Sequence, residues 1–86
     1  MAYTVQYTQS AARALRRLDR TTQRRVIAKI ELLQRDPRPA QAIKLTGSEA
    51  YRIRVGDYRV IYAIADERLI VLIVEIGHRR DVYRSV

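Results

Sequence analysis

One stretch of twelve residues, 51 to 62, with the sequence YRIRVGDYRVIY, constrains the fold of this chain more than any other. Apolar and basic residues alternate on both sides of Gly56-Asp57, which is the period-2 pattern of strands with one buried face. A two-residue loop with glycine in first place is typical of a type II′ turn. The sequence therefore predicts a β-hairpin whose strands run from Tyr51 to Val55 and from Tyr58 to about Ala65.

This hairpin register places three arginines on one face of the predicted sheet. A two-residue turn sets Arg54 directly opposite Arg59, and opposed residues of an antiparallel pair project to the same side. Arg52 alternates onto that side as well. Like charges in such positions are destabilising, so the arrangement indicates a surface that holds a polyanion. The plainer alternative is a solvated outer face with scattered arginines.

The composition favours the same kind of partner. The 86 residues carry a formal charge of +8, which suits one basic domain over residues 1–86 that binds nucleic acid or an acidic protein. The chain has no cysteine and one histidine, which excludes disulfides and argues against a metal site. The longest apolar run, from Leu69 to Val74, is far too short to cross a bilayer, and no signal peptide is visible. We expect a cytoplasmic protein without a cofactor.

Two helices are expected before the hairpin. The expected elements are a strand over 3–8, a helix over 9–19, a break near 20–21 and a second helix up to about residue 35. Thr8 or Ser10 can cap the first helix, and Pro37 stops the second one because proline disfavours the α region in the residue before it. Two helices joined by so short a break form a helical hairpin whose apolar stripe needs a sheet to cover.

The second half of the chain supplies that sheet. It is expected to form a connector over 37–49 with a turn at 45–48, the hairpin, a turn over 65–68, a strand over 69–76 and a C-terminal tail. The last strand is apolar throughout, which is typical of a central strand, and Gly77 is expected to end it. It should pair with the second strand of the hairpin, since consecutive strands usually neighbour each other. The fold class is therefore α+β: three antiparallel strands form a small sheet with both helices on one face.

The usual catalytic sets are absent from the sequence, including phosphate-binding loops, Ser-His-Asp sets and metal-ligand clusters. RNA, however, carries its own nucleophile, the 2′-hydroxyl, and arginines could position the strand and neutralise charge in the transition state. Proton transfer would then fall to His78 or Tyr83. A lone histidine after a strand is more often a plain surface residue, and Tyr83 could equally pack on the core.

Three stretches together resemble the RelE family of bacterial toxins, within the RelE/ParE superfamily of toxin–antitoxin systems. They are LTG at 45–47, YRIRVGDYRVIY at 51–62 and IGHRRDVY at 76–83. The resemblance implies a ribosome-dependent, metal-independent endoribonuclease that cuts mRNA in the ribosomal A site by attack of the 2′-hydroxyl and so inhibits translation. It also implies a cognate antitoxin that blocks the site in a hetero-oligomeric complex.

The resemblance also suggests site residues. By position, the catalytic candidates are Arg52, Arg54, Arg59, Arg79, Tyr83 and, from the reasoning above, His78. Further RNA-binding candidates are Arg13, Arg17, Lys44 and Arg80, although the stripe of arginines on the first helix could equally be a solvated face.

Two points stay open. The well-known RelE has lysines where Arg52 and Arg54 stand, and a lysine can lose its proton and act as a base far more readily than an arginine. The identity of the general base is therefore open. ParE-like members of the superfamily share the fold but bind DNA gyrase and cut no RNA, so a gyrase inhibitor is the alternative function. A degenerate toxin that only binds its antitoxin or RNA is a third possibility.

Overall fold

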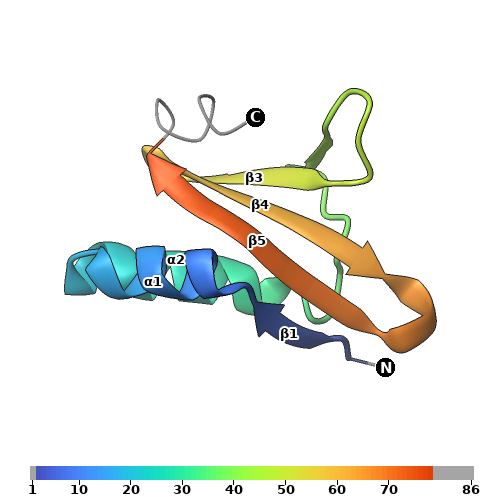
Figure 1. Cartoon of the computed structure of the whole chain (residues 1–86), viewed down its shortest axis with the longest axis horizontal. Helices are drawn as coiled ribbons and strands as arrows, with labels where there is room; N and C mark the ends of the chain where they lie inside the picture. Colours follow the sequence, from blue (N-terminus) through green and yellow to red (C-terminus); the bar gives the residue numbers. More distant parts are fainter. Residues whose placement is uncertain (1, 79–86) are drawn as a thin grey trace.

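The structure, a computed structural model, describes residues 2–78. Its elements are β1 (Thr4–Tyr7), α1 (Gln9–Arg17), α2 (Arg20–Leu32), β2 (Ile43–Lys44), β3 (Tyr51–Val55), β4 (Tyr58–Ala65), the 3₁₀ helix η1 (Asp66–Arg68) and β5 (Ile70–His78). The strands form one sheet in the order β1-β5-β4-β3-β2. Both helices lie on the same side of it (Figure 1). The predicted α+β fold, with two helices on one face of a small sheet, is confirmed.

Side-chain caps set the helix boundaries. The Thr8 hydroxyl accepts a hydrogen bond from the Ala11 amide at 3.1 Å and so caps α1. Of the two predicted caps, Thr8 and Ser10, the structure has Thr8. The Asp19 carboxylate accepts from the Thr22 amide at 3.2 Å and caps α2. A capping residue must leave the helix, so α1 ends at Arg17 and the break falls at 18–19. The predicted end of α1 at Asp19 and the predicted break at 20–21 are wrong by about two residues.

The β3–β4 hairpin has the predicted register. Arg54 pairs with Arg59 across the two strands. Gly56 has φ +60°, whereas Asp57 does not have a positive φ, as a type II′ turn requires. The glycine is needed here because L-residues with a side chain rarely adopt this backbone conformation.

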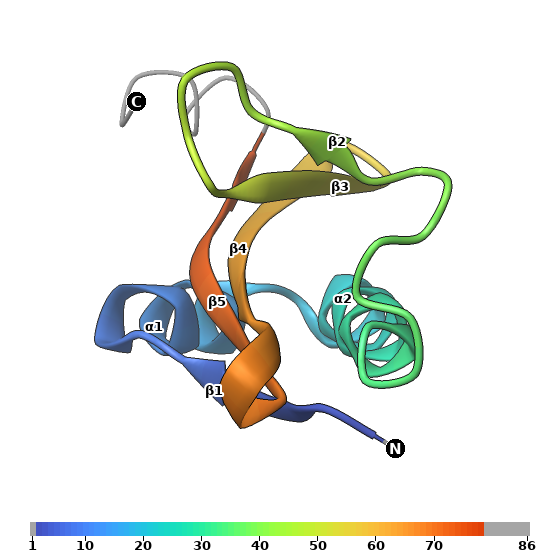
Figure 2. The same cartoon turned by 90° about the vertical axis from the view of Figure 1, so that its right-hand side faces the viewer.

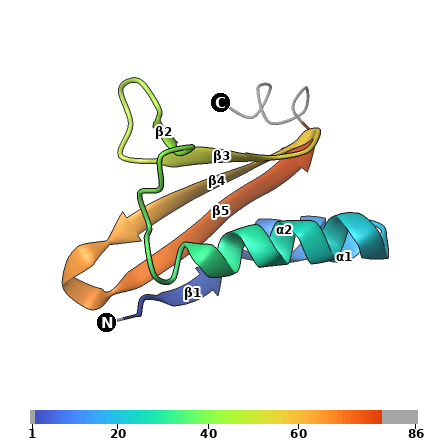
Figure 3. The ribbon, with the colours of Figure 1, turned by 180° about the vertical axis from the view of Figure 1, so that it is seen from behind.

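β5 is the central strand of the sheet, as the apolar run predicts. It pairs antiparallel with β4 and parallel with β1, so the first strand joins the same sheet through a crossover that contains both helices. The prediction that Gly77 ends the strand is wrong: Gly77 stays in the ladder opposite Arg59, and β5 runs on to His78. The two-residue strand β2 within the connector was also not predicted. Figure 3 shows the connector running from the end of α2 to β2, which is the edge strand farthest from β1.

The core lies between the helices and the sheet face toward them (Figure 2). From the helical layer, buried side chains come from Ala11, Val26, Ile30 and Leu33. From the sheet, they come from Ile53, Val55, Val60, Tyr62, Val71, Ile73 and Ile76. The sheet residues alternate along each strand except at a β-bulge in β5, where the register to β4 shifts between Ile61 and Tyr62. The residues between these core positions therefore point to the other face of the sheet, and they include Arg52, Arg54 and Arg59.

Candidate active site

Three arginines share the face of the sheet that points away from the helices. Arg52 and Arg54 alternate with the core residues of β3, and Arg59 lies opposite Arg54 on β4. Paired residues project to the same side, so the predicted grouping of the three is confirmed by the register. We call this surface, defined by Arg52, Arg54 and Arg59, the arginine face.

The three side chains differ in exposure. Arg59 is 3% exposed, Arg52 is half-buried and Arg54 is exposed. The Nε atom of Arg52 is buried and makes no hydrogen bond to the part of the chain that the structure describes. Guanidinium groups held in a partly buried setting attract an anion more strongly than groups in bulk water do. The face can therefore bind phosphate through Arg54 at its surface and Arg52 and Arg59 beneath.

His78 does not join the arginine face. Its register partner is Tyr58, whereas Arg59 pairs with the preceding residue of β5, Gly77. Successive residues of a strand point to opposite sides, so His78 and Tyr58 lie on the side of the sheet that also carries the core. Their rings meet edge to face with centroids 5.6 Å apart. The structure thus separates the one histidine from the three arginines with which the sequence reasoning grouped it.

The further RNA-binding candidates also lie apart from the arginine face. Arg13 and Arg17 are exposed on α1, in the layer beneath the sheet. Lys44 pairs with Tyr51 and therefore projects to the helix side at the sheet edge, where its Nζ is 3.3 Å from the Glu49 carboxylate. The remaining candidates, Arg79, Arg80 and Tyr83, lie outside the described residues.

One acidic residue on the arginine face was missed by the sequence reasoning. Glu75 pairs with Ile61, and Ile61 pairs with Arg52, so the three form a row across β5, β4 and β3. Glu75 also lines a hollow of about 560 Å³ on this side of the sheet. The other lining residues are Thr8, Ser10, Leu45, Thr46, Ser48, Ala50, Ile61 and Val74. Plain alternation from the core residues Val71 and Ile73 would place Glu75 on the core side, and the β-bulge after Ile73 turns it to this face instead.

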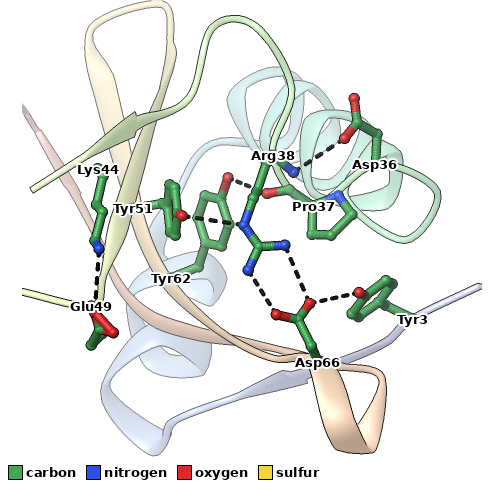
Figure 4. A network of polar contacts seen from close by, with 9 residues as sticks. All are labelled: Tyr3, Asp36, Pro37, Arg38, Lys44, Glu49, Tyr51, Tyr62 and Asp66. Atoms are coloured by element: carbon green, nitrogen blue, oxygen red, sulfur yellow. Dashed lines mark hydrogen bonds and ion pairs between the residues drawn. The ribbon is translucent and has the colours of Figure 1, made fainter.

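A polar network lies at the end of the β3–β4 hairpin that is farthest from the Gly56 turn (Figure 4). Arg38 in the connector donates two hydrogen bonds to the Asp66 carboxylate, at 2.8 and 3.2 Å, and a third to the Tyr51 hydroxyl. The Tyr3 hydroxyl donates to the same carboxylate at 2.7 Å. The hydrogen bonds from Arg38 and then Tyr3 lower the pKa of Asp66 below its usual range. These contacts tie the connector to β3 and η1, and η1 to the residue before β1, and so hold β3 in place.

A buried tyrosine adds to this anchor. The Tyr62 hydroxyl donates to the Pro37 carbonyl oxygen at 2.7 Å, and burial raises the pKa of Tyr62 to about 12. Its ring stacks on Tyr51, with centroids 5.8 Å apart. The start of β3, which carries Arg52, is therefore braced from the core side.

Two further observations concern the described residues alone. Residues 2–78 contain no group of three His, Cys, Asp or Glu side chains placed to hold a metal ion. Over the same range, neither helix is long and apolar enough to span a bilayer.

Fold and site together describe a small basic protein that presents arginines on the open face of a helix-backed sheet, and known proteins are similar to it in sequence and fold. The model of the family described as "ParE toxin of type II toxin-antitoxin system, parDE" matches residues 5–83. "Toxin RelG" of Mycobacterium tuberculosis is 35% identical, over 98% of this chain and 99% of its own length. "mRNA interferase toxin RelE" of Escherichia coli is 29% identical, over 92% of this chain and 85% of its own.

Solved structures agree with these sequence matches. RelE in the archaeal RelE–RelB complex from Pyrococcus horikoshii has a TM-score of 0.81 and 32% identity, over 92% of this chain and 97% of that one. The fold is thus that of toxins from type II toxin–antitoxin systems. The chain belongs to the RelE family of the RelE/ParE toxin superfamily.

Proposed function

We propose that this toxin is a ribosome-dependent endoribonuclease that cuts mRNA in the ribosomal A site. The observation that carries the proposal is the arginine face itself. Arg54 stands directly opposite Arg59 although like charges in that position are unfavourable, and a bound phosphate chain relieves their repulsion. The similarity to proteins named mRNA interferase supports RNA as the polyanion.

In the proposed reaction, the 2′-hydroxyl of the RNA attacks the neighbouring phosphorus, giving a cyclic phosphate and a 5′-hydroxyl. Arg52, Arg54 and Arg59 hold the phosphate oxygens and stabilise the charge that develops on them. By resemblance to the family, Arg79 and Tyr83 join them, with Arg79 on the phosphate and Tyr83 in proton transfer or in stacking on a base. Always-charged guanidinium groups supply the positive charge, so the reaction needs no metal ion.

We also propose that a cognate antitoxin binds this toxin, as RelB binds RelE in the similar complexes. An acidic segment of the antitoxin lying across the arginine face would neutralise its charge and exclude RNA. The setting for both partners is the cytoplasm, where translating ribosomes are.

The test is 5′-end mapping of a defined mRNA in a bacterial cell-free translation system, with and without the protein, alongside a control that lacks ribosomes. Cuts inside translated codons that require ribosomes support the proposal. Cuts in the absence of ribosomes mean a free ribonuclease on the same fold. An uncut message with normal translation overturns the proposal.

The alternative is inhibition of DNA gyrase without nuclease activity. It is favoured by one observation, that the matching family model carries the ParE description. A supercoiling assay with purified gyrase decides between the two functions. Loss of supercoiling with intact mRNA supports the alternative, and unchanged supercoiling with cut mRNA excludes it.

A further inference from the structure

None of the three arginines that define the arginine face can readily accept a proton. Attack by a 2′-hydroxyl requires its proton to be removed, and an arginine stays protonated at neutral pH. His78 lies on the opposite side of the sheet. The titratable side chains that the described strands project onto this face are Arg52, Arg54, Arg59 and Glu75. Among them, only the Glu75 carboxylate accepts protons readily.

The position of Glu75 suits that task. Gly77 pairs with Arg59, and Glu75 is two residues before it on the same face, so it is the diagonal neighbour of Arg59. Diagonal Cα atoms in a sheet lie about 7–8 Å apart, within reach of long side chains. Because Gly77 has no side chain, Glu75 is the described β5 side chain nearest to Arg59 on this face. A phosphate held by Arg59 would thus sit beside the carboxylate.

Glu75 is also accessible and uncommitted. It is half-buried on the wall of the hollow of about 560 Å³, which is large enough to admit part of a nucleotide. Within residues 2–78, the ion pairs join Arg38 to Asp66 and Lys44 to Glu49, and neither they nor the side-chain hydrogen bonds involve Glu75. A negative charge here weakens the attraction for RNA, so phosphate binding alone does not account for it.

We propose that Glu75 is the general base of RNA cleavage, an assignment that rests on the nuclease function proposed above. Its carboxylate takes the proton of the 2′-hydroxyl while the 2′-oxygen forms a bond to phosphorus. The bond from phosphorus to the 5′-oxygen breaks, and the departing oxygen takes a proton from water. The resulting hydroxide accepts the proton from Glu75, which restores the carboxylate. Arg59 and Arg54 hold the phosphate throughout.

The test compares single-turnover cleavage of mRNA on stalled ribosomes by the wild-type toxin, Glu75→Gln and Glu75→Asp. Glutamine keeps the shape but accepts no proton, so Glu75→Gln should cut at least about 100-fold more slowly. Glu75→Asp keeps a carboxylate and should retain a measurable part of the rate. Binding to the ribosome, measured in parallel, should be as tight for Glu75→Gln as for the wild type or tighter, because a repulsive charge is removed.

The outcomes separate the two proposals. If Glu75 acts only through its charge, Glu75→Gln binds RNA better and cuts as fast as the wild type or faster, which overturns the assignment but leaves the nuclease function standing. If the wild type cuts nothing, the nuclease function fails and the assignment with it. Glu49→Gln, which removes an exposed carboxylate from the loop between β2 and β3, is the matched control and should cut at the wild-type rate.

Discussion

Arg54 and Arg59 face each other across the β3–β4 hairpin, one exposed and the other 3% exposed. Directly opposed like charges in a sheet are destabilising by some tenths of a kcal/mol up to about 1 kcal/mol. In our account, this pair therefore lowers the stability of the fold while it contributes to RNA binding. A mutation that removes one of the two charges should affect the two properties in opposite directions.

We accordingly expect Arg54→Gln to raise the free energy of unfolding by up to about 1 kcal/mol while lowering RNA cleavage. Arg54 is the better choice for this change because it is exposed and its replacement leaves the core intact. Urea denaturation of both proteins measures the first effect and mapped mRNA cuts measure the second. A less stable variant that still cuts normally would contradict the idea of a functional charge pair.

The buried hydroxyl of Tyr62 gives a second prediction. Tyr62→Phe removes its hydrogen bond and leaves the Pro37 carbonyl without that donor, which should cost about 1–3 kcal/mol. Tyr51→Phe is the control, since its hydroxyl accepts from Arg38 near the surface, and it should cost less than about 1 kcal/mol. Urea unfolding curves check both, and equal losses would show that burial at Tyr62 adds nothing.

The network around Asp66 gives a dependence on pH. The pKa of Asp66 is lower in the folded protein than in the unfolded chain, so its ion pair stabilises the fold at neutral pH. That contribution is lost as the pH falls through the carboxylate range, because the unfolded chain, in which Asp66 has its ordinary pKa, takes up a proton more readily than the folded protein does. We expect the stability of Asp66→Asn to fall less than that of the wild type between pH 7 and pH about 3. Thermal melts over this range test it, and parallel curves would contradict it.

The turn at Gly56 gives a further test of stability. An added Cβ meets no atom within 4 Å, so the cost of Gly56→Ala comes from the φ of +60° alone. It should be about 1–2 kcal/mol. Asp57→Ala, at the next position and without a positive φ, is the control and should change the unfolding free energy by less than about 0.5 kcal/mol. Equal effects of the two changes would exclude a type II′ turn.

Local patterns made much of this molecule predictable. The alternation and the turn in residues 51–62 define the hairpin and its register. The arginine face could therefore be predicted from the sequence alone. The unbroken apolar run that begins at Leu69 likewise indicated a central strand, because a strand buried on both faces has no polar alternation. In each case the informative contacts lie within about a dozen residues of each other.

The features that were missed depend on distant contacts. Gly77 reads locally as a strand breaker, but pairing with Arg59 on β4 keeps it in the ladder. The β-bulge between Ile73 and Glu75 shifts the alternation of β5, so Glu75 lies on the arginine face and His78 on the core side. The parallel pairing of β1 with β5 joins residues more than sixty positions apart, and no local pattern encodes it.

The most direct test of the central claim, that the arginine face is the cleavage site, compares Arg52→Gln with Arg68→Gln in ribosome-dependent mRNA cleavage. Both changes remove one positive charge, but Arg68 lies exposed in η1, between β4 and β5, and not on the sheet strands that form this face. We predict that Arg52→Gln reduces the mapped cuts at least tenfold and that Arg68→Gln leaves them within twofold of the wild type. Equal loss in both variants would mean that net charge alone drives activity, and full activity of Arg52→Gln would place the site elsewhere.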